Sequence, residues 1–271
     1  MNVKDMLNQL DYLYNTGDLK EAERRLDSWL EQALQTRNYA AALTFYNEME
    51  GLYRTTGRSR QAADISDKAL QLIEIMGLKN TVHHATTLLN GATANRWAQN
   101  LDKALDMYHQ AADIYRSLDL KNSYVMASLY NNISHIYQQQ NNHEKALDSL
   151  QTALNLVSNM EDSASEIATT KVAMSLSYMA LGNMNAAKEA INAALAYYES
   201  DEGQSDGHYG SALSAMGEYY WRCEDYDNAI MTYEKALKVT RSRFGESDGC
   251  KVITRNMDIV RKEMEEKQQK G

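Results

Sequence analysis

Histidine, cysteine and acidic side chains are the groups in this chain that could catalyse a reaction or bind a metal ion. There are six histidines, two cysteines and 37 acidic residues among 271. Two histidines chelate one metal ion from a helix only when they share a face, but His83 and His84 are adjacent and point in different directions. The other histidines have no cysteine or histidine at ligand spacing; they are His109, His135, His143 and His208. We therefore expect no metal site and no cofactor.

Short motifs give no better support for catalysis. No His-Glu-x-x-His, Walker or dinucleotide-binding pattern occurs, and we expect no serine to act as a hydrolase nucleophile. Cys223 and Cys250 lack Cys-x-x-Cys spacing, and nothing in the sequence indicates an activated thiol. The protein is therefore predicted not to be an enzyme.

Composition predicts an all-α globular protein. Hydrophobic residues make up 44% of the chain and charged residues 24%, and there is no proline to interrupt helices. No apolar segment reaches the roughly eighteen residues that a membrane span needs, and the N-terminal residues do not have the pattern of a leader peptide. We expect a cytoplasmic protein with reduced thiols.

The net charge of -9 bears on the choice of partner. An acidic surface repels the phosphates of nucleic acids and of anionic membranes. Acidic and basic residues are mixed along the charged tail from Arg261 to Lys267, so no basic segment offsets that repulsion. We therefore expect neither nucleic acid nor a membrane as a partner.

A repeat of about 42 residues runs along the chain. A small residue, here called the marker alanine, begins the second half of each copy; the six are Ala22, Ala62, Ala104, Ala146, Ala187 and Ala229. Four residues after the markers come Leu26, Ser66, Tyr108, Leu150, Ile191 and Tyr233, and seven after them come Trp29, Ala69, Ala111, Ala153, Ala194 and Ala236. Nine residues before the markers come Leu13, Tyr53, Asn95, Tyr137, Tyr178 and Tyr220. Alanines let two helices approach closely and a tyrosine fills the remaining gap, so each copy predicts a packed helix hairpin.

The copies are predicted at about residues 2–35, 38–77, 80–120, 122–162, 163–200 and 208–245, together residues 1–245. Helices are expected to end at a turn residue before each second helix: Gly17, Gly57, Gln99, Asn141, Gly182 and Cys223. Residues 248–271 are predicted to form a capping helix with a charged tail, because the last repeat would otherwise expose an apolar edge. The loop from Asp201 to Gly207 is interpreted as a longer turn between repeats, and no linker divides the chain.

The repeat pattern resembles the tetratricopeptide repeat, in particular the 42-residue variant of kinesin light chains. The sixth copy carries the family pattern at Leu213, Met216, Gly217, Tyr220, Ala229, Tyr233 and Ala236. Features of the longer variant are the pair Asn131-Asn132 and the turn Phe244-Gly245-Glu246. The resemblance implies a right-handed superhelical solenoid of about six antiparallel helix hairpins. HEAT and armadillo repeats have a similar length but lack the observed spacing of small and large residues.

In this family the first helix of each repeat lines an inner groove, and the resemblance implies the same here. Asn131, His135 and Gln138 are spaced by four and three residues, so they share one helix face. The side-chain amide of asparagine can donate a hydrogen bond to a peptide unit and accept one from it. The resemblance implies that Asn90, Asn131 and Asn132 bind a peptide backbone in this way. The candidate groove residues are Asn47, Arg54, Asn90, Arg96, Asn131, Asn132, His135, Gln138, Glu218 and Trp221.

Other side chains on the same faces would select the ligand. Arg54 and Arg96 could bind a carboxylate of the ligand. Leu176, Met179 and Trp221 offer an apolar surface for a hydrophobic side chain of the ligand. The alternative is that the asparagines bridge neighbouring helices and that the arginines are solvated or paired with nearby acids.

Three functional hypotheses follow. The first is a non-catalytic scaffold that binds a protein or an extended peptide in the groove. The second is a peptide-responsive signalling regulator that acts in trans on a kinase, phosphatase or transcription factor. The third is a structural protein that assembles with copies of itself, so a homo-oligomer is possible.

Overall fold

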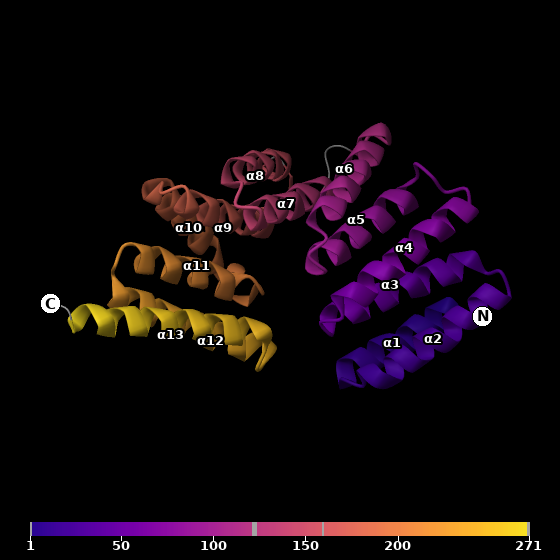
Figure 1. Cartoon of the computed structure of the whole chain (residues 1–271), viewed down its shortest axis with the longest axis horizontal. Coiled ribbons are helices and arrows are strands. Elements are labelled where there is room, and N and C mark those ends of the chain that lie inside the picture. The colour runs from indigo at the N-terminus through magenta and orange to yellow at the C-terminus, as the bar shows by residue number, and fades with distance from the viewer. Residues whose placement is uncertain (1, 121–123, 159, 270–271) are drawn as a thin grey trace. The chain divides into compact units, whose positions relative to one another are not determined.

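The protein is all-helical in the part that the computed structural model describes, residues 2–120, 124–158 and 160–269 (Figure 1). Within those residues there are thirteen α-helices and one short 3-10 helix, and no strand. The all-α fold made of helix hairpins is thereby confirmed. The predicted start of the fourth copy at Asn122 and the end of the tail at Gly271 lie outside the described residues.

The chain forms two compact units, Met1–Asn122 and Ser123–Gly271. Unit 1 contains α1 (Val3–Thr16), α2 (Leu19–Gln35), α3 (Tyr39–Thr55), α4 (Ser59–Ile75), α5 (Val82–Trp97) and α6 (Leu101–Ser117). Unit 2 contains α7 (Tyr124–Gln139), α8 (His143–Val157), α9 (Ala164–Ala180), α10 (Met184–Tyr198), η1 (Gly203–Ser205), α11 (Tyr209–Arg222), α12 (Tyr226–Phe244) and α13 (Asp248–Gln268). Consecutive helices pair as hairpins in both units, and each pair from α1–α2 to α11–α12 falls within one sequence repeat (Figure 1).

One hydrogen-bond pattern joins the two helices of all six hairpins. The N–H of the residue that precedes the second helix donates to the carbonyl five residues earlier, as in a Schellman motif. The donor–acceptor pairs are Asp18–Leu13, Arg58–Tyr53, Asn100–Asn95, Asn142–Tyr137, Asn183–Tyr178 and Asp225–Tyr220. Four of the donor residues also cap the second helix with their side chains: Asp18, Asn142, Asn183 and Asp225. A single residue therefore closes one helix and starts the next.

The residue before each of these donors adopts a left-handed conformation, which explains the glycines predicted at the turns. Gly17, Gly57 and Gly182 have φ of 74° to 75°, and Gln99 and Asn141 take the same region at 65° and 56°. In the sixth copy the prediction was displaced by one residue. Glu224 has φ 61°, while Cys223 is the C-cap residue with φ -84°.

Leu13 and Asn95 depart from the tyrosine pattern, and the structure accounts for Asn95. Its side chain is fully buried, donates to Gly91 O at 2.9 Å and accepts from Asn100 Nδ2 at 3.0 Å. Asn100 consequently makes no capping bond to α6. The side chain of Asn100 therefore bonds to the buried amide of Asn95 and does not cap α6.

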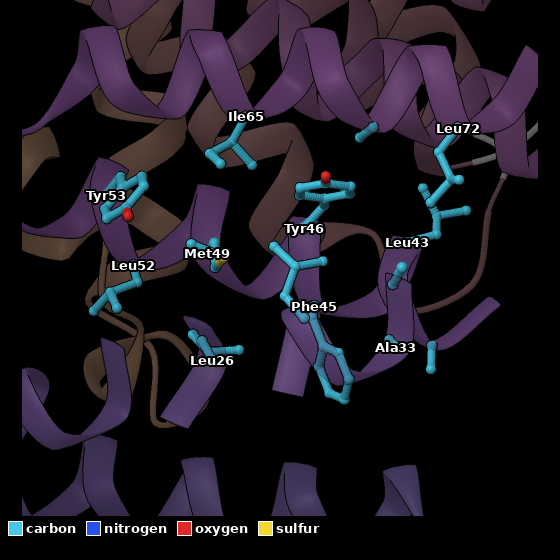
Figure 2. Close-up of a cluster of buried hydrophobic side chains, with 14 of the residues drawn as sticks. Leu26, Ala33, Leu43, Phe45, Tyr46, Met49, Leu52, Tyr53, Ile65 and Leu72 are labelled. Atoms are coloured by element: carbon cyan, nitrogen blue, oxygen red, sulfur yellow. The ribbon is translucent and has the colours of Figure 1, made fainter. Parts of the chain in front are cut away.

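The core confirms the repeat register. All six marker alanines are fully buried, and so are the residues four places after them. In unit 1 the apolar residues of α3 pack between α2 and α4, with Phe45, Tyr46 and Met49 at the centre (Figure 2). Trp29 of α2 lies 5.9 Å from Phe45 between ring centroids. Since no hairpin buries such a face by itself, each depends on its neighbour in the stack.

Unit 2 ends in α13, which packs on α12 through Ile253, Met257 and Val260. Val252, next to Ile253 in the same helix, is 54% exposed. The loop between α10 and α11 contains the 3-10 helix, whose Gly203 is buried against α10.

Candidate functional site

All ten candidate residues lie on first helices of the hairpins, and all ten are half-buried. Asn47 and Arg54 of α3 and Asn90 and Arg96 of α5 belong to unit 1. The remaining residues lie in unit 2, on α7 and α11: Asn131, Asn132, His135, Gln138, Glu218 and Trp221. Each unit thus presents its own set of polar side chains, and the two sets have different surroundings.

In unit 2, three adjoining pockets share Leu176 of α9, and we call them together the α9 groove. The first, about 290 Å³, lies between α7, α9, α10 and the start of α11. The second, about 500 Å³, lies between α9, α11, α12 and α13, and the third, about 690 Å³, lies between α7, the start of α8, α9 and α11. Val172 lines two of the pockets, as does Glu218. First helices therefore form most of the walls, and the terminal helix completes one of them.

Asn131 lies in the wall of the α9 groove and has a buried polar atom without a partner in the described structure. Its Nδ2 donates to Thr170 Oγ1 of α9 at 3.1 Å. Its Oδ1 is buried and has no hydrogen-bond partner in the described part of the chain, and the residue lines the 290 Å³ pocket. A buried acceptor without a donor costs about 1–3 kcal/mol.

The neighbouring polar residues on α7 are already engaged within the chain. Gln138 donates to Ala173 O and to Ser177 Oγ, each at 2.9 Å, and so ties α7 to α9. His135 Nδ1 lies 3.2 Å from Gln138 Oε1. Asn132 donates to Ser128 O of its own helix at 3.0 Å and lines none of the three pockets. Asn131 and Asn132 are adjacent in sequence but differ in what they offer a ligand.

Glu218 and Trp221 of α11 also have partners. Trp221 Nε1 donates to Glu263 Oε2 of α13 at 2.7 Å, which braces the terminal helix. Glu218 pairs with Arg222 at 2.8 Å, yet its carboxylate remains at the edge of two pockets. Of the apolar residues expected as an anchor surface, Leu176 lines all three pockets, whereas Met179 is only 2% exposed and lines none.

Sequence reasoning missed the groove residues outside the first helices. Tyr198 closes the 290 Å³ pocket from α10; its hydroxyl lies 3.0 Å from Thr169 Oγ1, and burial raises the pKa of Tyr198 to about 12. Phe244 and Val252, both more than half exposed, line the 500 Å³ pocket from α12 and α13. Two features of the sequence could have indicated these residues. One is the long loop between α10 and α11, and the other is the pair of apolar residues, Phe244 and Val252, on either side of the turn between α12 and α13.

Unit 1 shows polar atoms without partners on α3 and α5. Asn47 Oδ1 and Arg96 Nε are buried and make no hydrogen bond within the described residues. Seven arginines form ion pairs in the described chain, and Arg54 and Arg96 are among the six that do not, together with Arg37, Arg60, Arg243 and Arg255.

Glu50 is a buried acid that the sequence pattern did not single out. It is 2% exposed, and its Oε2 has no partner in the described structure. Burial raises the pKa of Glu50 to about 7, and the attraction of Arg54 opposes that rise. Four other copies have a small residue at this position, three before the tyrosine site: Ala92, Ser134, Ser175 and Gly217.

The second hairpin accommodates Glu50 because the opposing residue is small. In the sixth hairpin a Cβ on Gly217 would lie 3.0 Å from the Tyr233 ring, so these two positions face each other. The second copy has Ser66 where the sixth has Tyr233. Glu50 therefore takes volume that a large side chain of the second helix fills in other copies.

Two segments do have the Gly-x-Ser-x-Gly spacing of a hydrolase nucleophile, residues 203–207 and 245–249. That motif acts from a sharp turn between a strand and a helix. Ser205 instead ends the 3-10 helix, and Ser247 is the N-cap residue of α13. Their hydroxyls donate to Glu202 O at 3.4 Å and to Cys250 Sγ at 3.6 Å. The spacing therefore occurs here without the structural context that gives it catalytic meaning.

Two searches of the described residues concern other kinds of site. No three His, Cys, Asp or Glu side chains gather there as metal ligands would. In residues 2–120, 124–158 and 160–269, no helix combines the length and the apolar character that crossing a bilayer requires.

Comparison of sequences connects the fold to a known repeat. A sequence model described as tetratricopeptide repeat matches residues 83–159 and 166–242, more than half of the chain. No curated protein sequence matches. The match favours this repeat over the HEAT and armadillo repeats of similar length.

Solved structures agree at the level of the fold. BtubC (BKLC) from P. vanneervenii is 20% identical, with a TM-score of 0.65 over 84% of this chain and 92% of its own. A putative kinesin light chain from Podosopora anserina with TPR-like repeats is 12% identical, with a TM-score of 0.59 over 76% and 97%. NprR in complex with its cognate peptide NprX is 17% identical, with a TM-score of 0.65 over 95% and 78%.

Proposed function

Because the chain belongs to the tetratricopeptide repeat family, we propose that it is a non-catalytic protein that binds an extended peptide segment of a partner. The binding surface is the α9 groove, and the observation that carries the proposal is the unpaired, buried Oδ1 of Asn131 in its wall. Family membership supports protein or peptide binding, and the groove supplies a surface for it.

Polar and apolar groups of the groove bind different parts of the ligand. Asn131 Oδ1 accepts an N–H of the peptide backbone, which fixes the register of the ligand. A hydrophobic side chain of the ligand enters the 500 Å³ pocket between Leu176, Phe244 and Val252. Gln138 and Trp221, whose polar atoms bond to α9 and α13, hold the walls in place.

The proposal also limits the partner. The net charge of -9 disfavours nucleic acid and anionic membranes, and binding through the groove requires no cofactor. We place the protein in the cytoplasm, where its two free cysteines would stay reduced.

A second function is favoured by one comparison. NprR, which shares this fold over 95% of the present chain, forms a complex with its cognate peptide NprX. By analogy, the bound peptide would be a signal, and the protein would regulate a kinase, phosphatase or transcription factor in trans. Small-angle scattering with and without a groove-binding peptide separates the two functions. A regulator is expected to change its radius of gyration when the peptide binds. An unchanged scattering profile would contradict the regulator function and leave the scaffold function.

Asn131 and Asn132 provide a matched test of the groove. Peptides selected from a displayed random library on the intact protein would serve as ligands. Asn131→Ala should weaken their binding about tenfold, because a hydrogen bond to a buried acceptor contributes about 1.4 kcal/mol. Fluorescence anisotropy measures the dissociation constants, and circular dichroism checks that both variants are folded.

Asn132→Ala is the control, because it removes the same side chain from the next position but only a bond within α7. Its binding should equal that of the wild type. Equal binding by the Asn131→Ala variant would show that the selected peptides do not use the groove.

A further inference from the structure

His208 lines the 290 Å³ pocket of the α9 groove, and Asp206 fixes which of its ring nitrogens can bind a ligand. Asp206 Oδ1 lies 2.8 Å from His208 N and 3.0 Å from His208 Nδ1, while Ser165 Oγ donates to Asp206 Oδ2. Burial would raise the pKa of Asp206, but these hydrogen bonds lower it below its usual value, so the group is a carboxylate and only accepts. His208 Nδ1 must then carry a proton, and the lone pair of the neutral ring is on Nε2. The side chain is 59% exposed, so a ligand can reach that acceptor.

A chain of hydrogen bonds also fixes the orientation of Asn131 in the wall of the same pocket. Asn131 Nδ2 donates to Thr170 Oγ1 at 3.1 Å, and the Thr170 hydroxyl donates in turn to Glu166 O at 2.7 Å. Because the hydroxyl proton is used on Glu166, the oxygen of Thr170 can only accept from Asn131. The atom of Asn131 that has no partner in the described structure is therefore its acceptor, Oδ1.

The charged groups around the pocket are acidic. Among the described residues that line it, none is a lysine or an arginine. The carboxylates of Asp206 and Glu166 add to the effect of burial in raising the pKa of Tyr198 to about 12, and Tyr198 closes the pocket. Asp206 also accepts the N–H of His208 at the start of α11, which offsets the positive end of that helix. The pocket thus combines acceptors with a negative surrounding, which favours a cationic donor.

The neighbouring 500 Å³ pocket indicates which cationic donor fits. The two pockets share Val172, Leu176 and Ser211, so one ligand can occupy both. In a peptide, the N-terminal ammonium is attached to the same Cα as the first side chain. An ammonium in the 290 Å³ pocket therefore leaves that side chain beside the apolar 500 Å³ pocket. A lysine ammonium lies at the end of its own flexible chain, and fixing it in a pocket costs more side-chain entropy.

We propose that the 290 Å³ pocket binds the free N-terminal ammonium of the peptide ligand, with His208 Nε2 as an acceptor and Asn131 Oδ1 in the wall. The inference rests on the proposed function and deepens it. The backbone N–H that Asn131 accepts is that of the first residue, so the N-terminus of the peptide sets its register in the α9 groove.

Binding should weaken as the pH falls. Histidine is the side chain that ordinarily changes its charge between about pH 5 and 8. Protonation of His208 removes the acceptor at Nε2 and adds a positive charge beside the ammonium, and protonation of His135 would add a second one. The titratable side chains at the pocket, besides His208, are His135 of α7, Glu166 of α9, Tyr197 and Tyr198 of α10, and Asp206.

Chemically altered peptides identify the group that is bound. Peptides are selected on the intact wild type from a random library displayed with free N-termini, and the best one is synthesised with a C-terminal fluorophore. It is compared with its des-amino form, in which hydrogen replaces the α-amino group, and with a form in which norleucine replaces any lysine. The des-amino peptide should bind about tenfold more weakly, because hydrogen bonds to a charged group are lost. The norleucine form should bind as the parent peptide does.

His208→Leu locates the site, because it removes the acceptor and the titrating group together. His109→Leu is the control, since His109 is an exposed histidine on α6 in unit 1. Loss of the amino group should weaken binding to His208→Leu less than about threefold, and to the control as much as to the wild type. Circular dichroism checks that both variants are folded.

The same proteins test the dependence on pH. For the wild type and the control, the dissociation constant of the parent peptide should rise about tenfold from pH 7.5 to 5.5, and it should rise less for His208→Leu. The α-amino group of the ligand gains protons over this range, so its own titration cannot cause the loss.

The outcomes distinguish this inference from the function on which it rests. A des-amino peptide that binds as tightly as its parent, or an equal loss in the wild type and His208→Leu, would overturn the ammonium site and leave peptide binding intact. A loss seen only with norleucine would overturn the N-terminal assignment in favour of a lysine side chain. Tighter binding in acid would overturn it in favour of a carboxylate. Failure to select any peptide on the folded wild type would overturn the proposed function itself.

Discussion

Replacing Glu50 with glutamine is expected to stabilise the protein above neutral pH and to have little effect near pH 4.5. The pKa of Glu50 rises from 4.5 to about 7 because the carboxyl is buried. A raised pKa means that the folded state holds the proton more tightly than the unfolded state. The stabilisation from this difference is complete below pH 4.5 and is lost as the pH rises through about 7.

The size of the effect follows from the shift. A difference of this size corresponds to about 3 kcal/mol of unfolding free energy, which the wild type loses over this pH range. Glutamine keeps the shape of the side chain and cannot ionise, so the variant should not show the loss. Urea titrations followed by circular dichroism at pH 4.5 to 8.5 would measure the unfolding free energies of the wild type and the variant. The contributions of the other titrating groups cancel when one free energy is subtracted from the other.

Glu48 is the natural comparison, because it lies on the same helix but is only half-buried. Burial, with a smaller contribution from Asp11, raises the pKa of Glu48 as well. Glu48→Gln should therefore show the same trend with a smaller amplitude. Parallel stability curves for the wild type and Glu50→Gln across this pH range would mean that the Glu50 carboxyl is hydrated.

Gly203→Ala is expected to lower the unfolding free energy of unit 2 by about 3 kcal/mol, the upper part of the range for overpacking. A Cβ at residue 203 would lie 2.1 Å from Tyr197 O and 2.7 Å from Tyr198 Cα. Both are backbone atoms of α10, so the clash cannot be relieved by turning a side chain. The 3-10 helix would have to move away from α10, and thermal denaturation followed by circular dichroism would detect the loss.

Gly207→Ala, in the same loop, is the control. Its Cβ would meet only the end of the Phe244 ring at 3.1 Å, and that side chain is more than half exposed and free to turn. We expect a change below about 1 kcal/mol for this variant. A Gly203→Ala protein as stable as Gly207→Ala would show that the loop does not pack tightly on α10.

The Gly203 prediction also concerns the α9 groove. The loop leads into His208 and Ser211, which line the 290 Å³ pocket together with Tyr198 of α10. Movement of the loop would alter that wall, so the Gly203→Ala variant should bind groove ligands more weakly than the wild type. Sequence reasoning treated this segment only as a longer turn between repeats, because the sequence of a turn gives no sign of what the turn packs against.

Most of the fold could be read from the sequence because its causes are local and repeated. A left-handed residue five places before each marker alanine ends one helix, and the next residue starts the second. Alanine at the marker position permits close helix packing, and all six are fully buried. The one displaced turn, Glu224 instead of Cys223, departs by a single residue because glutamate gives no glycine-like signal for a left-handed conformation.

The candidate site could be predicted only in part. The helix faces were assigned from spacing, and the ten residues do lie half-buried on first helices. Spacing does not reveal whether a polar atom already has a partner, since the partners of Gln138 and Trp221 lie 39 and 42 residues away. Those separations are about one repeat, so the register itself could have suggested them.

The amino-acid sequence by itself determined that this chain is a series of tetratricopeptide-like hairpins, because caps, turns and alanine spacing act within one or two helices. Only the tertiary structure decided which polar groups are left for a ligand. Asn131 retains an acceptor without a partner, Asn132 bonds within its own helix, and Glu50 is enclosed. Burial and pairing depend on atoms contributed by neighbouring repeats, and a periodic pattern does not record them.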